Sequence, residues 1–164
     1  MKNTASVPHK ILSLHQLQQF VAVARLTGKT IAFTNGCYDI LHEGHIFSLS
    51  QAAAAADLLV VGVNADSSVK KLKGEGRPVN NEHSRALVLA SLIVTDAIVI
   101  FEEDTPFNLI NLVMPDVLVK GGDYTLDQIV GAKEVIANGG KVIINPILEG
   151  FSTTSIIEKI KKPA

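Results

Sequence analysis

Cysteine is nearly missing from this chain of 164 residues, in which Cys37 is the single one. A lone cysteine cannot form a disulfide within the chain, and this fits a protein of a reducing compartment. No base stands beside Cys37 as a nucleophile would need, so we interpret it as a small buried residue.

An excess of charge of either sign is also missing. The chain has 15 basic and 16 acidic side chains, and its formal net charge is −1. A basic surface is the electrostatic signature of a protein that binds nucleic acid or an anionic membrane. Neither partner is therefore indicated, and we expect small-molecule substrates.

Long apolar runs are missing as well. The first ten residues, MKNTASVPHK, lack the apolar core of a signal peptide. The longest apolar run, Ala86–Phe101, is broken by Asp96 and is too short for a membrane-spanning helix. These absences predict a soluble, cytoplasmic protein with no membrane partner.

The chain also lacks the marks of several domains or of common cofactor sites. No Pro/Gly/Ser-rich linker and no internal repeat divides it, and its 47% hydrophobic residues are typical of a globular protein. We predict one domain over residues 1–164, with residues 1–13 forming a flexible N-terminus. The motifs CxxC, HExxH and GxxxxGK[ST] do not occur, and we expect no metal held by protein ligands alone.

What the sequence does contain is a series of short β-branched runs that alternate with longer amphipathic stretches. Continuous apolar runs of this length are typical of strands buried on both faces of a parallel sheet. The predicted strands are Thr30–Asn35, Leu58–Asn64, Ala97–Phe101, Asp116–Lys120 and Lys141–Pro146. The predicted helices are Leu14–Leu26, His45–Ala56, Glu82–Ile93, Pro106–Val113, Leu126–Ala137 and Ser152–Lys161. The alternation predicts a single Rossmann-like, doubly wound α/β domain with a five-stranded parallel sheet.

The segment NGCYDILHEGH follows the first predicted strand and leads into a helix. Ligands of open parallel sheets bind beyond the carboxyl ends of the strands. Asn35 and Gly36 allow the backbone to approach a ligand closely, and the start of the next helix offers free N–H groups to an anion. His42 and His45, three residues apart, can lie on one side of its first turn. The segment therefore predicts a phosphate site.

These residues resemble the HxGH signature of a nucleotidyltransferase superfamily, and GFSTTSIIEKI (Gly150–Ile160) resembles its C-terminal segment. The blocks Lys70–Arg85, Phe101–Pro106 and Val117–Val142 are similar to heptose-phosphate adenylyltransferases, which in many bacteria form half of a bifunctional kinase–adenylyltransferase. The resemblance implies an enzyme that transfers AMP from ATP to D-glycero-D-manno-heptose 1-phosphate, with Mg²⁺ present. Relatives of this kind tend to form homodimers.

The resemblance also assigns site residues. It implies a catalytic group of His42, His45, Lys73 and Lys70. It implies that ATP or the acceptor contacts Thr34, Asn35, Gly36, Asp39, Arg85, Lys120, Gly121, Gly122, Asp123, Ser152, Thr153 and Thr154.

Several of these assignments have a structural alternative. Asp39 is as well suited to a bond across the loop as to a magnesium contact. Arg85 could grip a phosphate or pair with Glu82, three residues earlier. The polar segment Val69–Asn80 is a mobile lid in the functional interpretation and a solvated loop in the other.

Two other functions stay open. One is nucleotidyl transfer to another phosphorylated acceptor, such as glycerol 3-phosphate with CTP. Cytidylyltransferases of the superfamily carry an arginine shortly before the GISTT segment, and Ile147–Glu149 has none. The other is a nucleotide-binding module without catalysis, which the presence of both histidines disfavours.

Overall fold

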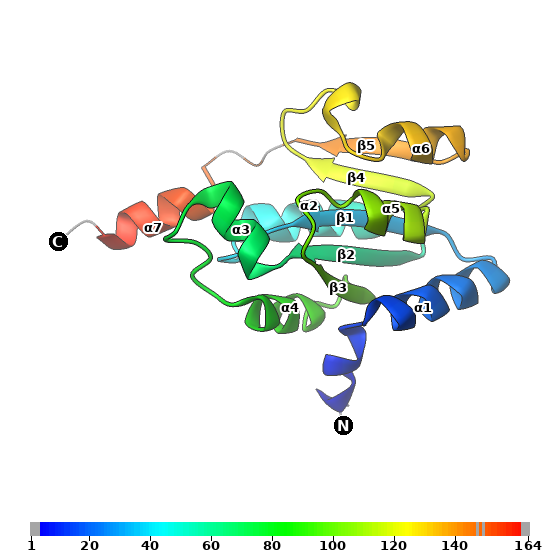
Figure 1. Cartoon of the computed structure of the whole chain (residues 1–164), viewed down its shortest axis with the longest axis horizontal. Helices are drawn as coiled ribbons and strands as arrows, with labels where there is room; N and C mark the ends of the chain where they lie inside the picture. Colours follow the sequence, from blue (N-terminus) through cyan, green and yellow to red (C-terminus); the bar gives the residue numbers. More distant parts are fainter. Residues whose placement is uncertain (1–3, 147, 149, 162–164) are drawn as a thin grey trace.

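A computed structural model describes residues 4–146, 148 and 150–161. Its centre is a five-stranded, all-parallel sheet with the strand order β3-β2-β1-β4-β5 (Figure 1). The strands are β1 (Ile31–Gly36), β2 (Leu58–Asn64), β3 (Ala97–Phe101), β4 (Val117–Gly121) and β5 (Lys141–Asn145). The predicted fold class is confirmed, and every predicted strand is correct to within one residue at each end.

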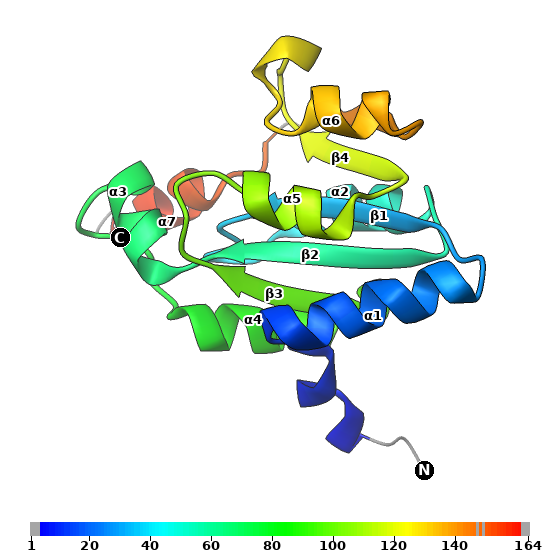
Figure 2. The same cartoon turned by 45° about the vertical axis from the view of Figure 1, so that its right-hand side comes forward.

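The helices are α1 (Leu14–Leu26), α2 (Glu43–Ala53), α3 (Asp66–Lys73), α4 (Glu82–Ala90), α5 (Phe107–Val113), α6 (Ala132–Ala137) and α7 (Thr153–Lys161). They cover both faces of the sheet because successive strand residues point to opposite sides. Phe33 joins the core formed with helices α1, α5 and α6, whereas its neighbour Ala32 joins the core formed with α2 and α4. In both views α5 lies in front of the sheet and α2 behind it (Figure 1 and Figure 2).

One predicted helix and one predicted loop were wrong. The stretch Leu126–Ala137 is not one helix, because a 3₁₀ turn over Leu126–Gln128 is separated from α6 by Gly131 in a left-handed conformation. The stretch Val69–Asn80 is not wholly a loop, since α3 extends as far as Lys73. Val69 is buried and anchors that helix, while the lysines of the helix are exposed. Its short polar sequence carries too few apolar residues for a visible helical period.

The predicted flexible N-terminus lies partly outside the described residues, which begin at residue 4. Ile11 forms a parallel bridge with Ile98 of β3. Lys10 donates hydrogen bonds to the carbonyl oxygens of Leu92 (3.1 Å) and Thr95 (2.7 Å). Residues 10 and 11 therefore contact the β3 side of the domain, while the flexibility of the segment stays a prediction. In the described part of the chain, no helix has both the length and the apolar composition needed to cross a bilayer.

We expect Gly131→Ala to destabilise the domain by about 2–4 kcal/mol. Gly131 has a φ of +80°, and a Cβ there would lie 2.8 Å from Cγ2 of Ile110. The left-handed conformation and the overpacking each contribute roughly 1–3 kcal/mol. Gly139→Ala is the matched control, because Gly139 has a φ of +84° and open space around it. Urea unfolding should show the larger loss for Gly131→Ala; equal losses would contradict the predicted clash with Ile110.

The order of the strands fixes where a ligand can bind. The chain runs from β1 to β2 and β3 on one side, then crosses to β4 and β5 on the other. The connections that leave β1 and β4 therefore diverge, and an open crevice forms beyond their carboxyl ends. Helices α3 and α7 lie at this end of the sheet in both views (Figure 2).

Candidate active site

A cavity of about 420 Å³ opens beyond the carboxyl ends of β1 and β4, and we call it the switch-point cavity. Its walls come from the β1–α2 connection, the end of β4, the end of α3 with the turn that follows it, and the start of α7. The predicted site residues that line it are Thr34, Asn35, Gly36, Asp39, His42, His45, Lys73, Lys120, Gly121, Gly122, Ser152, Thr153 and Thr154. The fold thus brings together segments that are distant in the sequence.

The two histidines form a stacked pair at the start of α2. Their ring centroids are 3.8 Å apart with an interplanar angle of 26°. The ring of Tyr38 meets His45 edge-on at 5.4 Å. Nδ1 of each histidine is buried and has no hydrogen-bond partner among the described residues. Buried polar atoms without a partner are uncommon in native proteins, and here they are available to a ligand.

Burial favours the neutral form of both imidazoles. Desolvation lowers the pKa of His42. It lowers the pKa of His45 further, to about 4, and the neighbouring charge on His42 adds to this effect. A bound anion would oppose both effects, because a negative charge favours the protonated ring.

Both carboxylate oxygens of Asp39 accept hydrogen bonds from other protein groups. Its side chain is fully buried, and its Oδ2 accepts a hydrogen bond from Nε of Arg77 at 2.5 Å. Its Oδ1 accepts from the backbone N–H groups of Val79 (2.7 Å) and Asn80 (2.9 Å). The structure therefore supports the bond across the loop that the sequence left as one of two alternatives.

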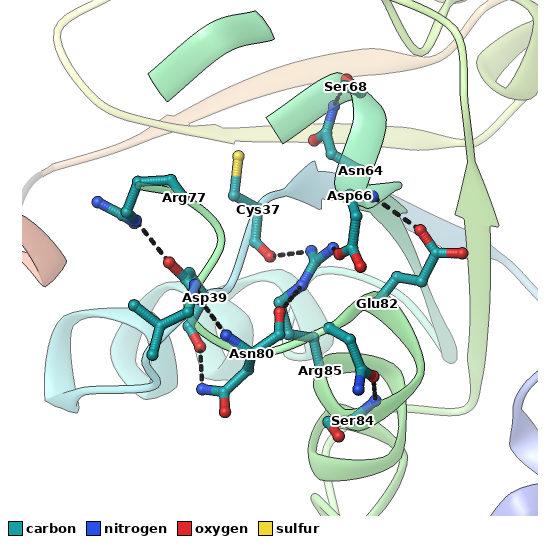
Figure 3. A network of polar contacts seen from close by, with 12 residues as sticks. Cys37, Asp39, Asn64, Asp66, Ser68, Arg77, Asn80, Glu82, Ser84 and Arg85 are labelled. Atoms are coloured by element: carbon teal, nitrogen blue, oxygen red, sulfur yellow. Dashed lines mark hydrogen bonds and ion pairs between the residues drawn. The ribbon is translucent and has the colours of Figure 1, made fainter. Parts of the chain in front are cut away.

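Arg85 does not line the cavity, in contrast to the predicted phosphate contact. Its side chain is fully buried. Its guanidinium donates to the carbonyl oxygens of Asn80 (2.9 Å) and Cys37 (2.5 Å) and to Oδ1 of Asp66 (2.7 Å) (Figure 3). Its ion-pair partner is thus Asp66 and not Glu82, whose carboxylate accepts from the backbone N–H of Asp66.

The lysines divide between the cavity and the surface. Lys73 lines the cavity, whereas Lys70 is exposed and does not. Lys120 also lines it, and its ammonium donates to Oδ1 of Asn35 at 3.3 Å across the β1–β4 boundary. Burial lowers the pKa of Lys120. Asp123 is exposed and lies outside the lining, so the structure does not place it with the other predicted residues.

A comparison with known protein families decides the family. The model of the cytidylyltransferase-like family matches residues 33–159, which include the cavity-lining segments from β1 to α7. The chain belongs to the cytidylyltransferase-like family. This membership confirms the predicted enzyme class, a nucleotidyltransferase.

Curated relatives of this cytidylyltransferase-like chain include bifunctional proteins. Bifunctional protein HldE of Nitrobacter winogradskyi is 56% identical over 147 residues, which are 90% of this chain and 30% of the relative. Bifunctional protein HldE of Rhodospirillum rubrum is 51% identical over 151 residues, which are 92% of this chain and 30% of the relative. The chain thus spans less than a third of these proteins, and the predicted resemblance to part of a bifunctional enzyme is confirmed.

Solved structures agree with the family. A lipopolysaccharide core biosynthesis protein from Thermoplasma volcanium has a TM-score of 0.59 and 29% identity, covering 74% of this chain and 98% of its own. Pantoate-beta-alanine ligase from Francisella tularensis has a TM-score of 0.60 and 15% identity, covering 92% of this chain and 76% of its own. The second likeness shows the fold alone.

Sequence reasoning missed nine residues that line the cavity of this cytidylyltransferase-like domain: Cys37, Tyr38, Gly44, Ser48, Arg77, Tyr124, Pro146, Leu148 and Phe151. Arg77 stands in the same basic segment as Lys73 and could have been found by its guanidinium chemistry. Tyr38 lies in the segment NGCYDILHEGH, four residues before His42. Its φ of 49° is positive, which is uncommon for a residue other than glycine. Tyr124 and Phe151 carried no signal, because a single aromatic residue in a loop is common.

The histidine pair should make the stability of the cytidylyltransferase-like domain depend on pH. The pKa of His45 is about 4 in the folded chain and 6.5 for the unperturbed side chain. Between these values the unfolded chain binds more protons, so the free energy of unfolding falls as the pH falls from 6.5 towards 4. We expect His45→Gln to lose less stability than wild type between pH 7.5 and 4.5 in urea unfolding. If the free energy of unfolding fell by the same amount between pH 7.5 and 4.5 in His45→Gln and in wild type, this prediction would be contradicted.

Proposed function

We propose that this chain transfers AMP from ATP to D-glycero-D-manno-heptose 1-phosphate, which yields ADP-heptose and pyrophosphate. The observation that carries the proposal is the pair of unpartnered histidine Nδ1 atoms in a cavity at the switch point of a cytidylyltransferase-like domain. The heptose substrate is supported by the sequence resemblance and by the match to bifunctional HldE proteins. The likeness to a lipopolysaccharide core biosynthesis protein points in the same direction.

The reaction needs positioning more than proton transfer. An oxygen of the acceptor phosphate attacks the α-phosphorus of ATP and forms a new P–O bond. The bond from this phosphorus to the bridging oxygen of the β-phosphate breaks, and pyrophosphate leaves with the electron pair. The attacking phosphate is already an anion, so no general base is required. The protein has to align the two phosphates and stabilise the charge that shifts to the leaving group.

In the proposed mechanism His42 and His45 stabilise that charge. Each imidazole can donate a hydrogen bond to a triphosphate oxygen at the start of α2, where the backbone N–H groups and the helix dipole also favour an anion. The bound anion raises the pKa of both rings, so that proton uptake can accompany binding. Ser152, Thr153 and Thr154 offer hydroxyl and N–H groups at the start of α7, and Lys73 and Lys120 add positive charge.

Magnesium, which the resemblance implies, does not fit a site made of protein ligands here. Among the described residues that line the cavity, Asp39 is the one carboxylate, and both of its oxygens accept hydrogen bonds. No group of three His, Cys, Asp or Glu side chains that could hold a metal ion occurs in the described part of the chain. Magnesium commonly binds through substrate phosphates and keeps several waters.

The test is pyrophosphate release from the purified protein in the presence of magnesium. ATP, CTP and GTP are each combined with heptose 1-phosphate and with glycerol 3-phosphate. We expect release only with ATP and heptose 1-phosphate. Release only with CTP and glycerol 3-phosphate would support the second candidate function, cytidylyl transfer, instead. No release from folded protein with any pair would overturn both.

Localisation and assembly follow as further proposals. We propose a cytoplasmic enzyme, because its proposed substrate ATP is a cytoplasmic metabolite. A homodimer is expected from the resemblance, and light scattering on the purified chain tests it.

A further inference from the structure

Arg77 is held by one end and free at the other. Its Nε donates to Oδ2 of Asp39, and its side chain is only 14% exposed. Among the residues that the structure describes, no group accepts a hydrogen bond from its two terminal nitrogens. The side chain lines the switch-point cavity. In Figure 3 the outer end of the guanidinium points away from the rest of the network.

Several hydrogen bonds around Asp39 hold Arg77 in place. Asp39 accepts hydrogen bonds from three successive parts of one segment: the Arg77 side chain and the N–H groups of Val79 and Asn80. The amide of Asn80 donates in turn to the carbonyl oxygen of Asp39 at 2.7 Å. The carbonyl oxygen of Asn80 accepts from Arg85, which is itself tied to Asp66. The segment 77–80 is thus fixed to the β1–α2 connection, and this fixes the direction of the Arg77 guanidinium.

The two arginines of this network have opposite roles. Arg85 directs every nitrogen-bearing part of its guanidinium at the protein and lies outside the cavity. Arg77 bonds the protein through Nε alone, so its two terminal nitrogens are available to a ligand in the cavity that it lines. Lys73 and Lys120 line the same space. Buried guanidinium groups with unpaired donors are costly unless an anion completes them.

We propose that Arg77 binds a substrate phosphate in the switch-point cavity and that Asp39 is the positioning residue that aims it. The inference rests on the proposed nucleotidyl transfer and names a binding group within that site. The ligand chemistry is a phosphate with two free oxygens, which a guanidinium holds in a fork and an ammonium cannot. This phosphate belongs either to the acceptor or to the nucleotide, since both enter the cavity.

The experiment compares Arg77→Gln, Arg77→Lys and the matched control Lys71→Gln. The control removes one positive charge from the neighbouring helix, where Lys71 pairs with Asp104 on the surface and does not line the cavity. KM and kcat are measured for ATP and for heptose 1-phosphate. Calorimetry gives the Kd of each substrate alone, so the readout does not depend on turnover.

We expect Arg77→Gln to raise the KM or Kd of one substrate about tenfold to a hundredfold, the usual effect of losing hydrogen bonds to a charged group. Arg77→Lys should recover only part of this loss, and Lys71→Gln should behave like wild type. The substrate whose affinity falls identifies the source of the phosphate. Asp39→Asn should weaken the same substrate, and the Asp39→Asn/Arg77→Gln double variant should be no worse than Arg77→Gln.

Unchanged Kd and KM values for both substrates in folded Arg77→Gln would overturn the inference and leave Arg77 a purely structural partner of Asp39. Full recovery by Arg77→Lys would also overturn it, because charge alone would then suffice. If no acceptor turns over, the proposed function fails, but the calorimetric Kd values still decide the role of Arg77.

Discussion

Replacement of His45 by alanine is expected to lower kcat about a hundredfold to a thousandfold. Loss of one preorganised donor to a charge that develops in the transition state typically costs about 3–4 kcal/mol of barrier. The fold should persist, because Nδ1 of His45 has no partner among the described residues and nothing is left unpaired when the ring is removed. Pyrophosphate release under saturating substrates measures kcat, and circular dichroism confirms the fold.

His42→Ala should lower kcat by a similar factor. In the double variant, kcat should fall by less than the product of the two single factors. The rings stack at 3.8 Å, and residues in contact that act on one ligand are seldom additive. His83→Ala is the control, since His83 lies exposed on α4 and away from the cavity. A His42→Ala or His45→Ala protein with wild-type turnover would contradict the mechanism, whatever the acceptor is.

The strands and the position of the site could be predicted because both depend on local patterns. A strand buried on both faces appears in the sequence as a continuous apolar run, and β2 and β3 were predicted without error. Polar residues that directly follow such runs must meet at one edge of a parallel sheet. Asn35 and Lys120 are 85 residues apart in the chain, and they are joined by a hydrogen bond at that edge.

The roles of Asp39, Arg77 and Arg85 could not be predicted because they depend on partners far away in the chain. The side chain of Arg85 bonds Cys37, which is 48 residues distant, and Asp39 bonds Arg77 at a distance of 38 residues. In the sequence, both arginines stand in a polar segment and look equally exposed. Only the fold distinguishes the arginine that is buried against carbonyl groups from the one that faces the cavity.

The two arginines also show why similarity to a motif assigns residues less securely than it assigns a family. The resemblance covered Lys70–Arg85 as one block, and the site residues it assigned there were Lys70, Lys73 and Arg85, without Arg77. The structure places Lys73 and Arg77 at the cavity, Lys70 on the surface and Arg85 in the interior. A helix that ends at Lys73 and a turn tied to Asp39 produce this separation, and neither had a clear signal in the sequence.

Replacement of Arg85 by methionine is expected to destabilise the domain by about 3 kcal/mol. Methionine preserves much of the side-chain volume but leaves the carbonyl oxygens of Cys37 and Asn80 and the carboxylate of Asp66 without their donor. Removing one partner of a buried ion pair typically costs about 3–5 kcal/mol, and the lower end applies because the Asp66 side chain is 34% exposed and can regain water.

Arg25→Met provides the comparison for this prediction. Arg25 and Asp116 form a pair of similar length, 2.6 Å, but their side chains are 37% and 39% exposed. Pairs in contact with water usually contribute less than about 1 kcal/mol. Urea unfolding of the two variants should therefore separate them by roughly 2 kcal/mol, and equal losses would show that Arg85 is not the buried clamp inferred from its contacts. Because Arg85 holds Asn80 and Asn80 holds Asp39, the same variant should also weaken substrate binding in the Arg77 assay, which ties the stability of this network to the geometry of the site.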